Sequence, residues 1–367
     1  MIDRLYVRGF KRVREESFDL GALTVLAGLN GSGKTSIIQA FLLAWEASAG
    51  ASGKTVRLNG PFGLALGTAE DVRNWESDGS IEIEAEESGE KSRWKFDAAS
   101  DEALYLTVIE KPSAPPLAFS QRPRAFSYLC AERLGPRSAL GTSPRAEDEF
   151  EVGAQGEHSA HILAALGDRL IEDGRRTHPT DARAVKSFLK YEVEAWLSEI
   201  AKPVEIEASR YPGSAITMLR YRSPGGDWVH APNMGFGVSY ALPVVLAGLI
   251  SETGGLFVVE NPEAHLHPAG QSRMGVFLAW LAGHGVQVLI ETHSDHVING
   301  IRRAIAEFGY LGEDRAVVYF FEGAGGSELS TRRLTFTGTG GISYWPTGFF
   351  DQYQLDVAAL GQIRRRR

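Results

Sequence analysis

The sequence of 367 residues contains a single cysteine, Cys130, and no apolar run long enough to cross a membrane. A lone cysteine excludes an internal disulfide, and such sparse use is typical of proteins in the reducing cytosol. The N-terminus lacks the basic and apolar segments of a secretory signal. We therefore expect a cytoplasmic protein with no membrane among its partners.

The chain also lacks an excess of positive charge, because its formal net charge is −8 at pH 7. This balance excludes a surface that is basic throughout, but it leaves open a local basic groove that binds DNA. The arginines at 364–367 are most simply interpreted as a solvated tail. A hydrophobic content of 43% indicates a globular protein, and the length allows one or two domains.

The chain does contain a phosphate-binding pattern, GLNGSGKT, at residues 28–35. It fits G-x-x-x-x-G-K-[ST], the P-loop. Residues 23–27 before it are apolar and β-prone, and residues 36–43 after it have a helical pattern. This context makes a coincidental glycine-rich turn the weaker interpretation. A second GKT at residues 53–55 follows a helical stretch and lacks the first glycine of the pattern, so we interpret it as a loop.

The P-loop pattern predicts how a nucleotide is held. Glycines let the backbone N–H groups point at the phosphates, and the following helix adds the positive end of its dipole. Lys34 should reach the β- and γ-phosphates, and the Thr35 hydroxyl should bind Mg²⁺. The predicted nucleotide-binding residues are Asn30, Gly31, Ser32, Gly33, Lys34, Thr35 and Ser36.

Two strands are expected before the P-loop, at residues 2–10 and 18–27. Lys11 and Arg12 lie on the turn between them, from which both side chains could reach back to the nucleotide. An ordinary exposed basic turn is an alternative of equal weight.

The middle of the chain adds two segments. Residues 78–111 alternate apolar and acidic positions around turns, which is typical of an antiparallel meander with one face in water. Residues 145–202 are mainly helical in pattern, and residues 184–200 carry one apolar face.

Charged residues follow a buried strand expected at residues 125–130. Sites in α/β folds lie at strand ends, which makes Glu132 and Arg133 candidates. The alternative is a surface ion pair.

A second anion-binding element is indicated at residues 233–239, before a helix expected at 240–250. Gly235, Gly237 and Ser239 would offer N–H groups to a phosphate at a helix start. The alternative is a loop with a serine cap.

Two further buried strands end in polar residues. Residues 256–260 are apolar up to Glu260, the pattern of a Walker B strand whose acid holds Mg²⁺. Residues 286–290 lead into ETHSDH at 291–296, and we expect both strand ends to share one site. A weaker alternative is a zinc site. It would use His265, His267, His293, His296, Glu260 and Glu263.

Together these motifs resemble the ATP-binding heads of ABC-type ATPases, in the soluble RecF, SMC and OLD-like branch. The likeness extends to a prokaryotic group of predicted AAA-family ATPases, through AERLGPR, GFGVSY, ENPEAHLHP and ETHSDHVINGIR. It implies one α/β head over 1–367: a P-loop NTPase of ABC type with a mixed core sheet flanked by helices. Residues 1–48 and 233–345 would form the nucleotide-binding core, 78–111 an antiparallel β arm, and 145–202 a helical insert.

The resemblance also implies roles for single residues. Residues 28–35 correspond to Walker A, Glu260 to the Walker B acid, and His293 to the histidine that senses the γ-phosphate. Residues 265–268 fall at the D-loop, and residues 235–239 at the signature. In such heads the signature of one subunit contacts the γ-phosphate bound by the other, which implies a homodimer with ATP at the interface.

The chain departs from this pattern at its catalytic pair. Where the family has Asp-Glu, this chain has Glu260 and Asn261. An amide can position water but cannot take its proton, so we expect slow hydrolysis with Glu263 as the base. His293 is the alternative base, because a neutral imidazole can accept a proton near pH 7. A Q-loop glutamine is not evident, and the loop with Glu132 and Arg133 occupies its place.

The expected function is hydrolysis of ATP with Mg²⁺, coupled to dimerisation, that regulates an effector or a DNA transaction in DNA repair or anti-phage defence. The alternative is an ATP-dependent binding switch that hardly turns over, because of Asn261. A P-loop kinase or GTPase leaves residues 235–239 and His293 unexplained. OLD nucleases carry a C-terminal nuclease domain, and too few residues follow His293 for one, so any nuclease would be a separate partner.

Overall fold

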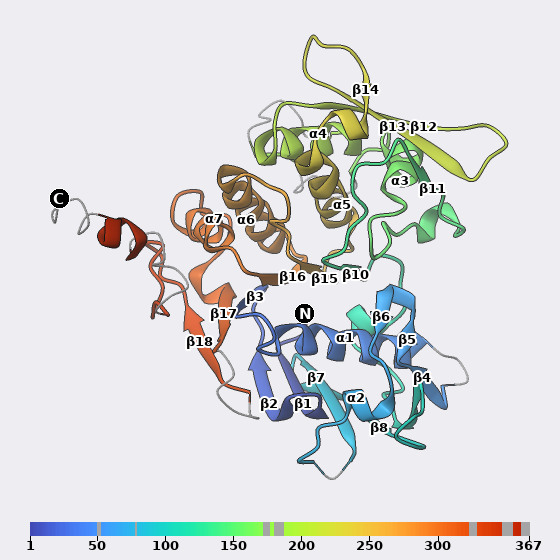
Figure 1. Cartoon of the computed structure of the whole chain (residues 1–367), viewed down its shortest axis with the longest axis vertical. Coiled ribbons are helices and arrows are strands. Elements are labelled where there is room, and N and C mark those ends of the chain that lie inside the picture. The colour runs from blue at the N-terminus through green and yellow to red at the C-terminus, as the bar shows by residue number, and fades with distance from the viewer. Residues whose placement is uncertain are drawn as a thin grey trace.

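The computed structural model describes residues 1–49, 53–77, 79–171, 177–179, 187–322, 329–346 and 355–360. The described residues stack in four layers: several helices, a central sheet, the single helix α1 (Lys34–Ala49), and an antiparallel sheet (Figure 1). Within these residues, none of the helices combines the length and the apolar character that crossing a membrane requires.

The central sheet is mixed, as the sequence predicts. Its strand order is β10 (Phe126–Leu129), β15 (Leu256–Glu260), β16 (Gln287–Thr292), β3 (Leu23–Gly28), β17 (Ala316–Phe321) and β18 (Thr331–Thr335). All neighbours pair in parallel except β18, which is antiparallel to β17. Side chains alternate between two cores, with Val25 on one side of β3 and Leu26 on the other. Because both faces are covered, the parallel strands are largely apolar, whereas the antiparallel edge strand β18 is mainly polar.

The second sheet is antiparallel, in the order β2 (Val13–Asp19), β1 (Arg4–Phe10), β7 (Ile81–Glu87), β8 (Glu90–Asp97), β9 (Tyr105–Glu110) and β4 (Thr55–Arg57). The meander predicted at residues 78–111 is present as β7, β8 and β9. It pairs with β1, so strands expected in the nucleotide-binding core and strands expected in the β arm form one sheet.

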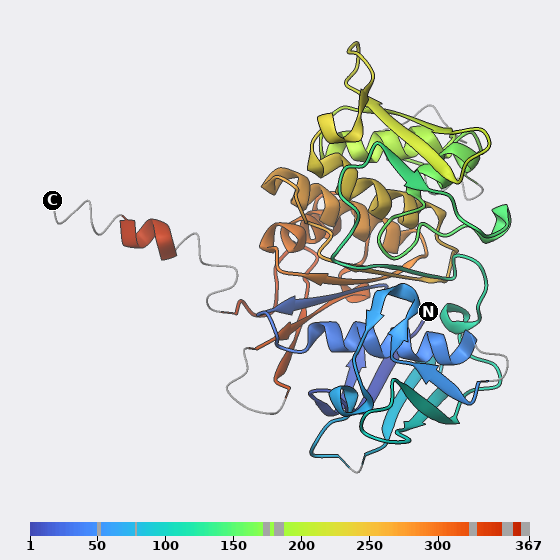
Figure 2. The same ribbon diagram turned by 45° about the vertical axis from the view of Figure 1, so that its right-hand side comes forward.

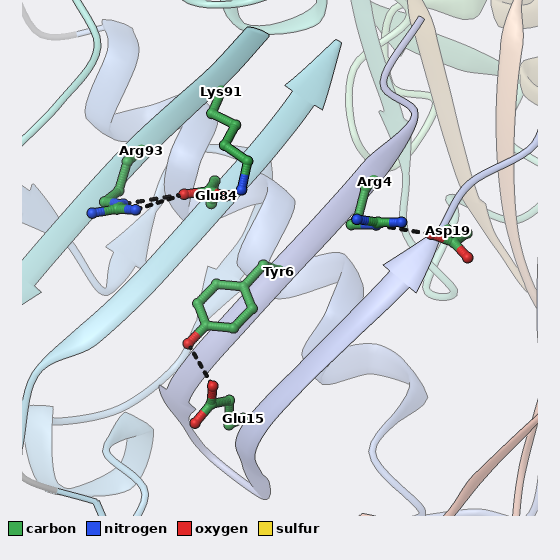
Figure 3. A network of polar contacts seen from close by, with 7 residues as sticks. All are labelled: Arg4, Tyr6, Glu15, Asp19, Glu84, Lys91 and Arg93. Atoms are coloured by element: carbon green, nitrogen blue, oxygen red, sulfur yellow. Dashed lines mark hydrogen bonds and ion pairs between the residues drawn. The ribbon is translucent and has the colours of Figure 1, made fainter. Parts of the chain in front are cut away.

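The outer face of this sheet carries the polar positions of the alternation. Arg4 pairs with Asp19, and the Tyr6 hydroxyl donates to Glu15 (Figure 3). Glu84 accepts from Lys91 at 2.8 Å and from Arg93 at 2.9 Å. These two cations leave Glu84 only 8% exposed, although its face is the wet one.

Helix α1 lies between the two sheets (Figure 2). Most of its residues are buried, among them Ile37, Phe41 and Leu43. A helix covered on two sides needs no single apolar stripe, which explains why its sequence is apolar nearly all round. The P-loop between β3 and α1 is thereby fixed at both ends.

The other face of the central sheet is covered by α5 (Phe236–Ile250), α6 (Pro268–Gly283) and α7 (Asp295–Ala306), with α4 (Leu189–Ile200) packed on α5 and α6. Helix α3 (Ser159–Leu166) packs on a small sheet at the far end (Figure 1). That sheet contains β11 (Ala139–Gly141), β12 (Glu205–Arg210), β13 (Ile216–Arg222) and β14 (Val229–His230). Three further short elements are α2 (Ala69–Val72), β5 (Asn59–Gly60) and β6 (Leu64–Ala65).

Three predicted elements differ from the structure. The strand expected at 18–27 is two strands in different sheets, because the chain turns at Gly21, where a side chain would overlap the Arg315 carbonyl. The helix expected from residue 240 already begins at Phe236. Helix α4 begins at Leu189, since Phe188 is extended and bridges to Leu170.

Some predictions fall outside the described residues. They concern part of the loop before the second GKT (50–52), parts of the helical insert (172–176 and 180–186), most of the aromatic tail (347–351) and the arginine tail (364–367).

Helices α6 and α7 touch backbone to backbone. A Cβ added at Gly300 would overlap the Ser272 carbonyl, and one added at Gly275 would overlap the Val297 carbonyl. This contact fixes the relative position of the loops that precede the two helices, after β15 and β16. Those two loops carry the polar strand ends.

We expect Gly300→Ala to lower the free energy of unfolding by about 2 kcal/mol. Alanine favours a helix by about 1 kcal/mol over glycine, but its methyl group would overlap main-chain atoms that cannot move away. Gly248→Ala is the matched control, because the nearest atoms there are the side-chain ends of Leu281 and Phe277. Denaturant unfolding of both variants measures the difference. Equal costs would show that the α6–α7 contact is not tight.

Candidate functional site

The carboxyl ends of β15, β16 and β3 lie side by side at one edge of the central sheet. The register pairs Glu260 with Glu291 and Thr292 with Ala27. A cavity of about 750 Å³ opens at this edge. Of the predicted site residues it is lined by Lys11, Arg12, Asn30, Gly31, Ser32, Gly33, Lys34, Thr35, Ser36 and His293.

The P-loop has the strand–loop–helix geometry that its sequence predicts. Gly28 has a φ of 131° and approaches Phe321 so closely that a side chain would overlap the Phe321 carbonyl. Lys34 is buried, and its ammonium donates to the carbonyls of Gly28 at 3.1 Å and Leu29 at 2.6 Å. Burial lowers the pKa of Lys34, while the nearby Glu291 opposes that shift.

Glu291 is a site residue that reasoning from the sequence missed. Its Oε1 accepts a hydrogen bond from the Thr35 hydroxyl at 3.0 Å, and it lines the cavity. It is 6% exposed, and its Oε2 is buried without a hydrogen-bond partner. Burial, and then the charge of Glu260, raise the pKa of Glu291 to about 7. The sequence did contain one indication of this role, because Glu291 is a polar residue at the end of an apolar strand, like Glu260.

Glu260 ends β15 as predicted, but its carboxylate is engaged on the side of β10. It accepts from the Tyr128 hydroxyl at 2.8 Å and from the Ala131 N–H at 3.2 Å. Burial raises the pKa of Glu260. Glu260 does not line the cavity, and it is Glu291 that bonds to Thr35.

Glu263 lies on the loop after β15 and contacts the loop after β16. Its Oε1 accepts from the His293 N–H at 2.9 Å, and its Oε2 is buried without a hydrogen-bond partner. Burial raises the pKa of Glu263 and lowers that of His293. Asn261, with a left-handed φ of 43°, also has a buried side-chain oxygen without a partner. Neither Glu263 nor Asn261 lines the cavity.

The predicted signature residues lie at the start of α5, outside the cavity lining. Gly235 is the residue before the helix, and Ser239 lies inside the helix, 9% exposed. The alternative of a serine cap is therefore wrong. The rings of Phe236 and Tyr240 lie 5.2 and 4.3 Å from the His265 ring. The signature thus contacts the loop that also carries Asn261 and Glu263.

His265 and His267 do not form a zinc site. His265 packs on aromatic rings, and His267 caps α6. In the part of the chain that the structure describes, no three His, Cys, Asp or Glu side chains are grouped to hold a metal ion.

Arg133 is buried, at 3% exposure, instead of forming a surface ion pair. Its guanidinium donates to the carbonyls of Cys130 at 3.0 Å, Glu260 at 2.7 Å and Asn261 at 2.7 Å. Desolvation lowers the pKa of Arg133. The side chain therefore joins the end of β10 to the end of β15, while its neighbour Glu132 is exposed.

Residues 23–128 and 132–299 match the family described as AAA domain, putative AbiEii toxin, Type IV TA system. The chain belongs to this AAA family. Residues 311–360 match a second family, described as a protein of unknown function (DUF3696). None of the curated proteins compared with the chain matches it.

Three solved structures that are similar to the chain are heads of SMC proteins. A Smc head from Pyrococcus furiosus, bound to the C-terminal domain of ScpA, is 11% identical, with a TM-score of 0.53 over 99% of both chains. A second SmcHead, bound to the C-winged helix domain of ScpA, is 12% identical, with a TM-score of 0.50 over 91% of this chain and 97% of that one. The SMC head from Thermotoga maritima is 15% identical, with a TM-score of 0.44 over 90% and 98%.

The family and the fold agree with the resemblance found in the sequence. The chain is an AAA-type P-loop ATPase domain with the fold of an SMC head, and the predicted fold class is confirmed.

In this AAA-family chain we expect Arg133→Ala to lower the free energy of unfolding by about 3 kcal/mol. The change leaves three main-chain carbonyls without their charged donor at a buried position. Arg137→Ala, an exposed change in the same loop, should stay within about 0.5 kcal/mol of the parent protein. Denaturant unfolding compares the two variants. Equal unfolding midpoints would contradict the role of Arg133 as a buried donor that joins the ends of β10 and β15.

Proposed function

We propose that this protein binds and hydrolyses ATP with Mg²⁺, that ATP joins two copies into a dimer, and that the dimer regulates a separate partner. The observation that carries the proposal is the shared cavity. One space is lined by the P-loop, by the linked pair Thr35 and Glu291, and by His293. A buried lysine beside main-chain N–H groups at a helix start is suited to a polyphosphate.

The residues present fit a magnesium ion. Mg²⁺ takes oxygen ligands and is usually held by one or two carboxylates together with substrate phosphates. Thr35 and Glu291 offer a hydroxyl and a carboxylate 3.0 Å apart, and Glu291 Oε2 is a buried acceptor that lacks a partner. Thr35 and Glu291 would hold the ion, which would neutralise negative charge on the phosphates. We assign Glu291 this role in preference to Glu260, whose oxygens bind Tyr128 and Ala131.

The same geometry suggests roles for the residues after β15 and β16. His293 lines the cavity and fits a contact with the γ-phosphate. Glu263 binds the His293 N–H, so it is better suited to position that loop than to act as the base first expected from the sequence. Asn261 has no basic form. These features also support the alternative function, an ATP-dependent switch with little turnover. Measurement of the initial rate of ATP hydrolysis with Mg²⁺ distinguishes this switch from a hydrolysing enzyme.

The signature supports action between two copies. The signature offers N–H groups at a helix start through Gly235, Phe236 and Gly237. These residues do not line the cavity that the P-loop lines. A second copy would bring this element to the phosphates. The SMC heads in the similar structures are bound to ScpA, and the matching family is described as a putative toxin. A protein effector in anti-phage defence or DNA repair, such as a nuclease, or DNA itself, is therefore the proposed target.

We expect Glu291→Gln to reduce the gain in ATP affinity that Mg²⁺ provides by at least about tenfold, because the change removes a charged ligand. Calorimetry of ATP binding with Mg²⁺ and with EDTA measures this gain. Glu260→Gln is the matched control and should keep most of it. If Glu260→Gln lost the Mg²⁺ dependence while Glu291→Gln kept it, the metal acid would be Glu260.

A mixed dimer tests action between copies. Phe236→Glu places a negative charge on an exposed residue of the signature, whereas Ser239 is too buried for such a change. We expect the variant to bind ATP as a monomer but to lose ATP-induced dimerisation and turnover, while Phe236→Leu keeps both. Mixing Phe236→Glu with Lys34→Ala restores one complete site and part of the activity. A mixture no more active than its components would rule out sharing of the signature.

A further inference from the structure

The cavity has a second wall, which the P-loop does not form. It consists of Lys11 and Arg12 of the β1–β2 turn and of Glu70, Asp71, Arg73 and Trp75 in and after α2. Trp75 belongs to this wall and is 72% exposed, more than any other exposed large hydrophobic side chain of the described chain. An indole left open beside a cavity is a large apolar surface that a flat ligand can cover.

The segment that carries Trp75 is held firmly to the turn that carries Lys11. Phe10 and Arg73 form an antiparallel bridge, and the Lys11 N–H donates to the Val72 carbonyl at 2.8 Å. Asn74, which is buried, donates from its N–H to Gly9 at 3.0 Å and from its side-chain amide to the Lys11 carbonyl at 2.7 Å. The main chain next to Trp75 is therefore held in place before any ligand arrives, which lowers the entropic cost of binding.

The β1–β2 turn is also hydrogen-bonded to α1, the helix that follows the P-loop. The Lys11 ammonium donates to the Gln39 side chain at 2.7 Å, and Gln39 belongs to α1, the helix that begins with Lys34. Both walls of the cavity thus form one connected frame, with a cation between the P-loop and Trp75.

The two walls also differ in charge. Glu70 and Asp71 line the wall around Trp75 together with three cations, so the charge of this wall is mixed. The P-loop, with Lys34, favours phosphate at the other wall. A nucleoside triphosphate that places its phosphates on the P-loop turns its uncharged base toward the wall of mixed charge and the exposed indole.

We propose that Trp75 forms the nucleobase subsite of this cavity, by stacking on the purine ring of the bound nucleoside triphosphate. This inference rests on the proposed function, because it needs the phosphates on the P-loop. Stacking on an aromatic side chain tolerates any base but favours the larger purine surface. The subsite would therefore add affinity for the nucleoside without contacting the reacting phosphates.

The test compares ATP with tripolyphosphate, which carries the same phosphates and no base, both with Mg²⁺ and by calorimetry. We expect Trp75→Ala to weaken ATP binding by about tenfold or more and to leave tripolyphosphate affinity unchanged. Trp75→Phe should recover most of the loss, since it keeps an aromatic face. Trp345→Ala, which removes an exposed tryptophan outside the cavity lining, is the matched control and should bind both ligands as the parent protein does.

Other outcomes have distinct meanings. If Trp75→Ala binds ATP as tightly as the parent protein, the subsite is refuted, and Trp75 is then open to another partner. Equal losses for ATP and tripolyphosphate would refute it too, because they would indicate a damaged cavity. Lys34→Ala should weaken both ligands. If the parent protein binds neither ligand, or if Lys34→Ala changes neither affinity, the proposed function fails and the subsite fails with it.

Discussion

The site depends on one constraint, the parallel register of β15, β16 and β3. It places Glu260 beside Glu291, both buried, and the half-buried Glu263 on the following loop adds a third carboxylate at the same edge. Burial raises the pKa of each, and neighbouring negative charge adds to this at Glu291. Such a cluster is costly unless partners compensate for it. Three acids at this edge therefore favour the binding of a cation.

The partners of these acids divide the edge into a closed side and an open side. Toward β10, Tyr128 and the Ala131 N–H satisfy Glu260, and Arg133 covers the adjoining carbonyls. Toward the P-loop, Glu291 has only the Thr35 hydroxyl for one oxygen and no hydrogen-bond partner for the other. The open side is therefore the one that faces the cavity. This asymmetry is the reason why we propose Glu291, and not Glu260 on the Walker B strand, as the acid that holds the metal.

Much of the fold could be predicted because buried parallel strands are continuous apolar runs. β15 ends at Glu260 and the P-loop begins after β3, as expected. The strand across residues 18–27 was wrong, because the sheet change at Gly21 depends on the distant Arg315. Glu291 and Trp75 were missed for a related reason. Their importance comes from Thr35 and from the β1–β2 turn, which are far away in sequence, and no local pattern indicates such contacts.

One loop, residues 261–267, connects the cavity to the signature. At one end Glu263 holds the main chain of His293, and at the other His265 packs against Phe236 and Tyr240. Asn261 and His265 both have left-handed φ values, 43° and 60°, which cost energy for residues other than glycine and are found where segments switch. Any shift of His293 against a phosphate must therefore act on the segment that supports the signature. In the dimer that we propose, the same contacts that complete the site within one copy would also shape the surface that it presents to the other.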